Sequence, residues 1–205
     1  MTTMSPTTCQ HPGTLCLAPF EACFAQTVAR WVSDPEQLRL LAPSSTFPLS
    51  PARVCRWVKP GGYAYLLVKV ETADGKCLAP PAGANPLGYG ELNPMRSDPA
   101  HLWIGHVLID PRRRGCGYGL RLTSLLVEEA FLRRGAGRIS LVVFPENVAA
   151  IRCYDKTGFS FIREERHRFG DRGPRHRLLR FELLRGAYFA KRERNPDYPS
   201  DLVAK

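Results

Sequence analysis

The chain has 205 residues, of which 44% are hydrophobic, enough for one domain with its own core. Its net charge of +10 favours anionic partners in general, whether nucleic acid, an anionic membrane or a phosphate-rich small molecule. The seven cysteines form no Cys-x-x-Cys pair, so we expect no metal site, no disulfide framework and a cytoplasmic protein with reduced thiols. We also expect no targeting segment and no membrane span.

The first part of the sequence predicts a short strand followed by helices. Residues 1–13 are polar and are expected to be a disordered lead. Asp34-Pro35 is expected to divide an amphipathic stretch into two helices, and Ser50 before Pro51 is typical of a helix start. The expected elements are a strand at 14–20, two helices within 20–42 and a third helix from Ser50.

The rest of the sequence alternates strands with helices. The expected elements are strands at 62–72, 86–93 and 101–110, a helix marked by Leu122, Leu125, Leu126 and Ala130, a strand at 138–144, a helix from Asn147 to Thr157, and a hairpin of strands at 159–169 and 175–185. Loops are expected at 73–86 and 170–174. These elements indicate an α+β fold with a mixed, mostly antiparallel central sheet flanked by helices. We assign 14–185 to one domain and 186–205 to a C-terminal tail.

The segment DPRRRGCGYG, residues 110–119, places three glycines between a strand and a helix. Such a turn directs backbone N–H groups and the positive end of a helix to one place, which favours an anion. It contains no Walker loop. Its glycines, Gly115, Gly117 and Gly119, are followed by Leu120 and do not have the spacing of a dinucleotide fingerprint.

The pattern VLIDPRRRGCGYGLRL resembles the acetyl-coenzyme A loop of the GNAT N-acetyltransferase superfamily. The family core, Arg/Gln-x-x-Gly-x-Gly/Ala, falls on Arg114, Gly117 and Gly119. A second match is ENVAAIRCYDKTGF, in which Asn147 opens a helix and Tyr154 follows seven positions later on nearly the same face. The resemblance covers about residues 14–185 and implies a GNAT-like acyl-CoA N-acyltransferase fold.

The resemblance implies that an acetyl group passes from acetyl-CoA to a primary amine by direct attack in a ternary complex. The turn would hold the diphosphate, with Arg112, Arg113 or Arg121 neutralising charge, and the strand before it would bind the pantetheine and polarise the thioester. Tyr154 would hydrogen-bond the leaving sulfur. The implied cofactor-binding residues are Val107, Leu108, Ile109, Arg114, Gly115, Cys116, Gly117, Tyr118, Gly119 and Asn147.

The general base is the residue that the resemblance leaves open. A lysine-like amine loses its proton at pH 7 at a cost of ~4.6 kcal/mol, and an α-amine at a cost of only ~1 kcal/mol. Two positions where many relatives carry a glutamate hold Trp103 and Val142 here. Glu91 is our candidate for the base, with His101 and His106 behind it. A solvent-exposed strand residue is an equally good interpretation of Glu91.

Two other functions remain compatible with the sequence. One is a CoA-binding or sensing module without turnover. The other is nucleic-acid binding through the basic C-terminal third, which we do not expect because no such motif is present. The acceptor amine stays open, and relatives are often dimers, so a homodimer is compatible with the resemblance. Candidate walls of the acceptor pocket, equally well explained as core residues, are Trp31, Phe47, Trp57, Phe161 and Phe169.

Overall fold

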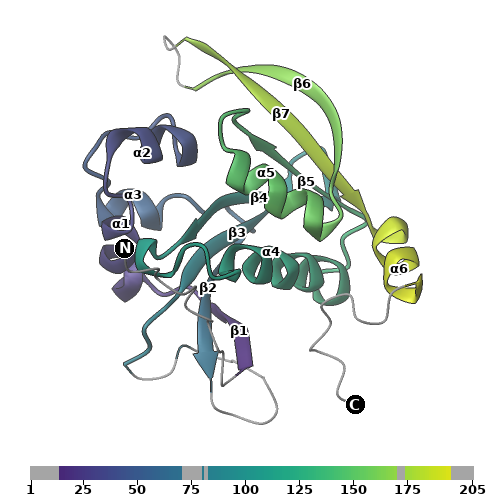
Figure 1. Cartoon of the computed structure of the whole chain (residues 1–205), viewed down its shortest axis with the longest axis horizontal. Coiled ribbons are helices and arrows are strands. Elements are labelled where there is room, and N and C mark those ends of the chain that lie inside the picture. Colours follow the sequence, from purple (N-terminus) through teal and green to yellow (C-terminus); the bar gives the residue numbers. More distant parts are fainter. Residues whose placement is uncertain (1–13, 71–79, 81–82, 170–173, 195–205) are drawn as a thin grey trace, which may run out of the picture.

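The computed structural model describes residues 14–70, 80, 83–169 and 174–194, and a sheet of seven strands runs through it (Figure 1). The spatial order is β1-β2-β3-β4-β5-β7-β6, and every neighbouring pair is antiparallel except β4 and β5. The strands are β1 Thr14–Pro19, β2 Tyr63–Val70, β3 Gly88–Met95, β4 Asp98–Ile109, β5 Arg138–Val143, β6 Ser160–Arg168 and β7 Arg175–Leu184. The predicted mixed, mostly antiparallel sheet is confirmed.

The helices begin where local capping signals predict. Asp34 accepts a hydrogen bond from the Gln37 amide at 2.9 Å, and Ser50 accepts one from the Arg53 amide at 3.3 Å. Gly158 ends α5 in the left-handed region, with φ of 98°. The helices are α1 Ala25–Arg30, α2 Pro35–Leu41, α3 Pro51–Cys55, α4 Tyr118–Glu128, which continues as a π-helical turn over Glu129–Arg133, α5 Val148–Thr157 and α6 Arg185–Arg194.

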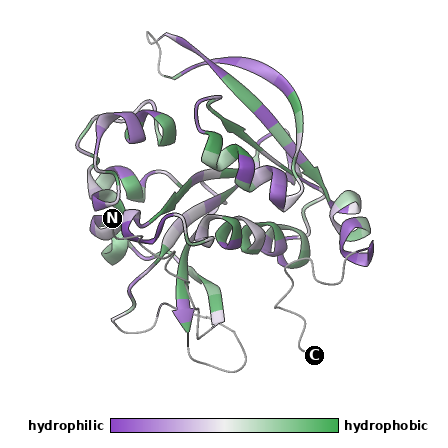
Figure 2. Cartoon of the chain, in the orientation of Figure 1, coloured by the Kyte–Doolittle hydropathy of each residue, from purple (hydrophilic) through white to green (hydrophobic). Residues whose placement is uncertain are grey.

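The helices cover the two faces of the sheet separately. Leu67 of β2 packs in a core with Leu122 and Leu126 of α4, whereas its neighbour Leu66 packs in a second core with Val28 of α1. Helices α4 and α5 lie side by side, and α1 to α3 gather near one end of the sheet (Figure 1). Hydrophobic residues concentrate on α4 and the central strands, whereas much of β6 is polar (Figure 2). The sheet therefore has one face toward α4 and α5 and another toward α1 to α3.

Two elements differ from the sequence prediction. Strand β4 begins at Asp98 and pairs there with Met95, so the hairpin with β3 extends past Pro94 and Pro99, residues that usually interrupt strands. Residues 186–194, which the sequence assigns to a C-terminal tail, form most of α6. Its Tyr188 is buried, with its ring 5.3 Å from that of Phe131, so this segment packs on the core.

Some expected features lie outside the described residues, namely the lead at 1–13 and most of the loops at 73–86 and 170–174. Across the described part of the chain, no helix is long and apolar enough to cross a membrane. Nor do the described His, Cys, Asp and Glu side chains form a group that could hold a metal ion.

Candidate active site

The parallel strands β4 and β5 pair over only three residues, from His101 with Arg138 to Trp103 with Ser140. Beyond Trp103, β4 continues along β3 and β5 continues along β7, and no described residue of β5 pairs with 104–109. The two strands therefore separate toward their carboxyl ends. Ligands of layered α/β proteins bind at this end of parallel strands, and the predicted pantetheine segment, Val107–Ile109, lies there.

The glycine turn connects the open end of β4 to α4. Gly115 and Gly117 have φ values of 77° and 80°, in the left-handed region that favours glycine. Gly117 is the N-cap of α4 and supplies no side chain to the first turn of the helix. A Cβ added at either glycine would meet no atom within 4 Å, so the space beside the turn is open. A helix N-terminus in such a setting attracts an anion.

The arginines of the turn do not all face a ligand. Arg112 binds the carboxylate of Asp110 at 2.8 Å, and this hydrogen bond lowers the pKa of Asp110. Nη2 of Arg114 reaches the N-terminal helices, donating to the Trp31 carbonyl at 3.5 Å and to Oε1 of Gln37 at 3.3 Å. The Arg114 side chain thus ties α1 and α2 to the turn, and the charge of Arg112 is already paired.

Helix α5 follows the open end of β5 and carries Asn147 and Tyr154. Oδ1 of Asn147 accepts a hydrogen bond from the Ala150 amide at 3.3 Å, so Asn147 is the helix N-cap. Burial raises the pKa of Tyr154, and the described residues offer its hydroxyl no hydrogen-bond partner. A Cβ on Gly119 would lie 3.9 Å from both Ile109 and Cys153, so the predicted segments of β4, α4 and α5 meet.

Glu91 lies on the face of the sheet covered by α1 to α3, and it is 0% exposed. Its carboxylate accepts hydrogen bonds from the Tyr89 hydroxyl at 2.7 Å, Nδ2 of Asn93 at 3.0 Å and Nδ1 of His106 at 3.1 Å. Burial raises the pKa of Glu91, but the hydrogen bonds of its partners, His106 first, outweigh it and hold the pKa below its ordinary value. Glu91 is therefore a buried, ionised carboxylate, and not an exposed strand residue.

A pocket of about 210 Å³ opens beside this carboxylate. Its walls include Trp57, Lys59, Glu91, Met95, Trp103 and His106. Gly105 faces Glu91 across the β3–β4 ladder, and a Cβ there would lie 3.4 Å from Oε2 of Glu91. A glycine at this position keeps the wall beside the carboxylate open. Three of the pocket residues, Lys59, Met95 and Asn93, carried no signal in the sequence because loop and hairpin geometry brings them together.

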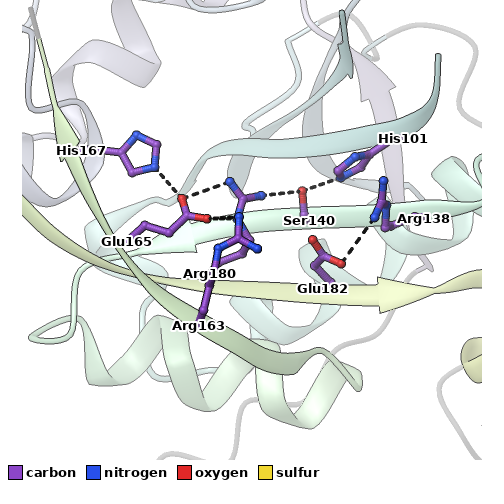
Figure 3. A network of polar contacts seen from close by, with 8 residues as sticks. All are labelled: His101, Arg138, Ser140, Arg163, Glu165, His167, Arg180 and Glu182. Carbon is purple, nitrogen blue, oxygen red and sulfur yellow. Dashed lines mark hydrogen bonds and ion pairs between the residues drawn. The ribbon is translucent and has the colours of Figure 1, made fainter. Parts of the chain in front are cut away.

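The candidate histidines lie in different environments. His106 lines the pocket, with its ring stacked on Trp57 at 4.3 Å between centroids and 4° between planes. His101 lies outside it, in a network on β4 to β7 where Nε2 is 2.6 Å from Oγ of Ser140 (Figure 3). Burial, and then the charge of Arg138, lower the pKa of His101. The structure thus brings only His106 to Glu91.

The network of polar side chains in Figure 3 lies next to the pocket, on the side of Trp103. Arg180 lies over the ring of Trp103 at 5.2 Å and binds Glu165, which also contacts Arg163 at 2.7 Å and His167 at 2.6 Å. The hydrogen bond from Arg180 and then that of His167 lower the pKa of Glu165 to about 2.

The other residues that the sequence suggests as walls of the acceptor pocket lie apart from one another. Trp31 is buried in the core of α1 to α3, Phe169 packs on Phe144 and His176, and Phe47 and Phe161 are exposed.

We expect Glu165→Gln to lower the free energy of unfolding by about 2 kcal/mol at pH 7, because it removes a charged hydrogen bond to Arg180. The pKa of Glu165 is depressed in the folded state, so its contribution is present above pH 4.5 and is lost as the pH falls to about 2. Urea unfolding at pH 7 and pH 3 measures both. The control is Glu164→Gln, whose ion pair with Arg177 is exposed and screened. An equal loss in both variants would contradict this prediction.

Comparison with known proteins gives the same family. The model of the acetyltransferase (GNAT) family matches residues 40–159. A spermine/spermidine N(1)-acetyltransferase from Bacillus subtilis is 33% identical over 60 residues, which are 29% of this chain and 40% of that protein. The matched segment thus spans less than half of that relative.

Solved structures share the fold. A spermidine N-acetyltransferase from Vibrio cholerae in complex with CoA and spermine has a TM-score of 0.65 at 17% identity, covering 86% of this chain and 98% of that one. A GNAT-family protein from Chromobacterium violaceum has a TM-score of 0.67 at 17% identity, covering 92% and 97%. The predicted fold is confirmed by this likeness. Because the family model matches more than half of the chain, the chain belongs to the GNAT family of acetyltransferases.

Proposed function

We propose that this protein transfers an acetyl group from acetyl-CoA to a primary amine. The observation that carries the proposal is the separation of β4 and β5 beyond Trp103, which leads directly into the glycine turn and the N-terminus of α4. Such an opening accepts a narrow arm along the free edge of β4, and the helix end accepts its phosphates. Coenzyme A has both parts. The family membership supports the same cofactor and reaction.

The cofactor would lie across the three segments that meet at Gly119. In this arrangement the backbone of 114–119 holds the diphosphate, with the exposed Arg113 nearby. The backbone of Val107–Ile109 bonds the pantetheine and polarises the thioester carbonyl, where a main-chain donor stabilises the developing oxyanion. Asn147 orders the start of α5. Tyr154 then donates a hydrogen bond to the departing sulfur, a role that fits a hydroxyl without a hydrogen-bond partner among the described residues.

The acceptor would enter the pocket beside Glu91. One buried carboxylate among aromatic walls, Trp57 and Trp103, suits a single protonated amine head. The Bacillus subtilis relative is a spermine/spermidine acetyltransferase and the Vibrio cholerae structure is a spermidine acetyltransferase, so polyamines are the acceptor class that we propose to test first. Lys59 on the pocket wall disfavours a second cationic group there, so the rest of a polyamine would extend outside the pocket.

A free-thiol assay tests the function itself. The protein is incubated with acetyl-CoA and a panel of polyamines, aminoglycosides, amino acids and peptides with free N-termini. We expect amine-dependent release of coenzyme A and an acetylated product of matching mass. Tight binding of acetyl-CoA with no thiol release for any amine would instead favour a CoA-sensing module.

We predict that Gly117→Val abolishes acetyl-CoA binding without unfolding the protein. A β-branched residue at φ of 80° is strained by about 1–2 kcal/mol and moves the backbone that would hold the diphosphate. Calorimetric titration gives the affinity and circular dichroism the fold. Gly135→Val is the matched control, because Gly135 also has positive φ and open space but lies at the far end of the α4 helix. Unchanged affinity in Gly117→Val would refute the assignment of the turn.

For Tyr154→Phe we predict that kcat falls by about 10- to 100-fold, because the leaving thiolate loses its hydrogen-bond donor. The affinity for acetyl-CoA and the stability should stay unchanged, since the hydroxyl has no described partner in the fold. Steady-state kinetics with binding measurements separates the two effects. Tyr188→Phe on α6 is the control, and a variant of Tyr154 with full kcat would exclude the proposed role.

A further inference from the structure

The proposed acetyl transfer needs a group that takes a proton from the amine, and the inference drawn here rests on that proposed function. Deprotonating a lysine-like amine at pH 7 costs ~4.6 kcal/mol. Glu91 carries the right charge, but it is fully buried and both of its oxygens already accept hydrogen bonds. To reach an amine in the pocket it would have to give up these bonds. A pocket residue that contacts Glu91 and keeps a free ring nitrogen is better suited to take the proton.

His106 is such a residue, because it lines the pocket and contacts Glu91. Nδ1 is 3.1 Å and 3.2 Å from the two carboxylate oxygens of Glu91. An ionised carboxylate can only accept, so Nδ1 carries the hydrogen in this bond, and in the neutral ring the lone pair is on Nε2. The described residues offer Nε2 no hydrogen-bond partner, and the side chain is 24% exposed on the pocket wall. The ring therefore presents a proton acceptor to the pocket.

Several contacts fix the imidazole in this orientation. The indole of Trp57 stacks against it. Oδ1 of Asn93 accepts from the Lys59 amide at 2.8 Å while its Nδ2 donates to Glu91, so one side chain ties the segment that carries Trp57 to the carboxylate. His106 itself has φ of 45°, at a register shift in the β3–β4 ladder. A non-glycine residue in the left-handed region stores strain, which concentrates at functional sites.

We propose that His106 is the general base of the acetyl transfer and that Glu91 is the residue that positions it. A protonated acceptor first releases one proton to solvent through His106. The neutral amine nitrogen then attacks the thioester carbon, a C–N bond forms, and a second N–H proton passes to Nε2 of His106. The C–S bond then breaks, coenzyme A leaves as a thiolate, and the imidazolium returns the proton to the thiolate through solvent. His106 directly precedes Val107, where the pantetheine segment of the proposed function begins.

The charge of Glu91 has a second effect, because it stabilises the imidazolium that forms during attack. Other titratable groups near this pair are Tyr89 on β3, Lys59 on the pocket wall and Cys55 at the end of α3, which acts on Tyr89. Burial, and then the charge of Glu91, raise the pKa of Tyr89, so this hydroxyl stays neutral. Glu91 is therefore the ionised group in direct contact with the ring.

The test compares His106→Gln, Glu91→Gln and the double variant with the wild-type protein, using the best amine of the panel. We expect His106→Gln to lower kcat at pH 7 by about 100-fold or more, with the acetyl-CoA Kd unchanged. In His106→Gln, the fall of kcat/KM at low pH should disappear. The difference in kcat between this variant and the wild-type protein should become smaller as the pH approaches the pKa of the amine. Glu91→Gln should lower kcat and shift this limb, and the double variant should be no slower than His106→Gln.

Two further variants keep the result interpretable. His167→Gln, in the separate network on β6, should keep the wild-type kcat. His106→Gly suits the positive φ, so it should fold, and added imidazole should restore part of its rate. If His106→Gln keeps the wild-type rate while Glu91→Gln loses it, Glu91 is itself the base and the inference is wrong. If the wild-type protein acetylates no amine, the proposed function fails and this inference with it.

Discussion

The short pairing of β4 with β5 is the constraint on which the rest of the site depends. Three residue pairs hold the parallel strands together, and beyond Trp103 each strand keeps only its outer antiparallel neighbour. Each strand then leads into a helix, α4 or α5, whose N-terminus follows the open end of the sheet. Backbone hydrogen-bonding groups and two helix N-termini therefore gather at one place. In the proposed function, this arrangement holds an extended, phosphate-bearing ligand.

The sheet carries two clusters around carboxylates, of which Glu91 is fully buried and Glu165 is partly buried. Glu91 is compensated by Tyr89, Asn93 and His106, and Glu165 by Arg180 and its neighbours. Each cluster is satisfied internally, which limits the cost of burying the charge. The two clusters differ in one respect. Only the Glu91 cluster places a titratable ring on a pocket wall, whereas the Glu165 cluster stiffens the strands beside Trp103.

Local signals in the sequence were sufficient for most of the fold. Asp34-Pro35, Ser50-Pro51, Asn147 and Gly158 start or end helices where expected, because capping depends on residues close in the chain. The packing of α6 was missed, since Tyr188 finds its partner Phe131 more than fifty residues away. The direction of the Arg114 side chain was missed for the same reason, because its acceptors lie on α1 and α2.

The relation of His106 to Glu91 shows where sequence reasoning stops. Gly105 pairs with Glu91, so strict alternation would turn the next residue, His106, to the face covered by α4. The register shift and the positive φ of His106 instead bring its ring to the carboxylate. Spacing along one strand cannot predict such an irregularity.

A crystal structure of the protein with coenzyme A bound would test directly whether the cofactor binds between the separated ends of β4 and β5. The account predicts the diphosphate on the backbone of 114–119, the pantetheine along Val107–Ile109, and the sulfur within hydrogen-bond reach of the Tyr154 hydroxyl. Coenzyme A bound away from the opening, or β4 and β5 paired along their full length in the complex, would contradict it.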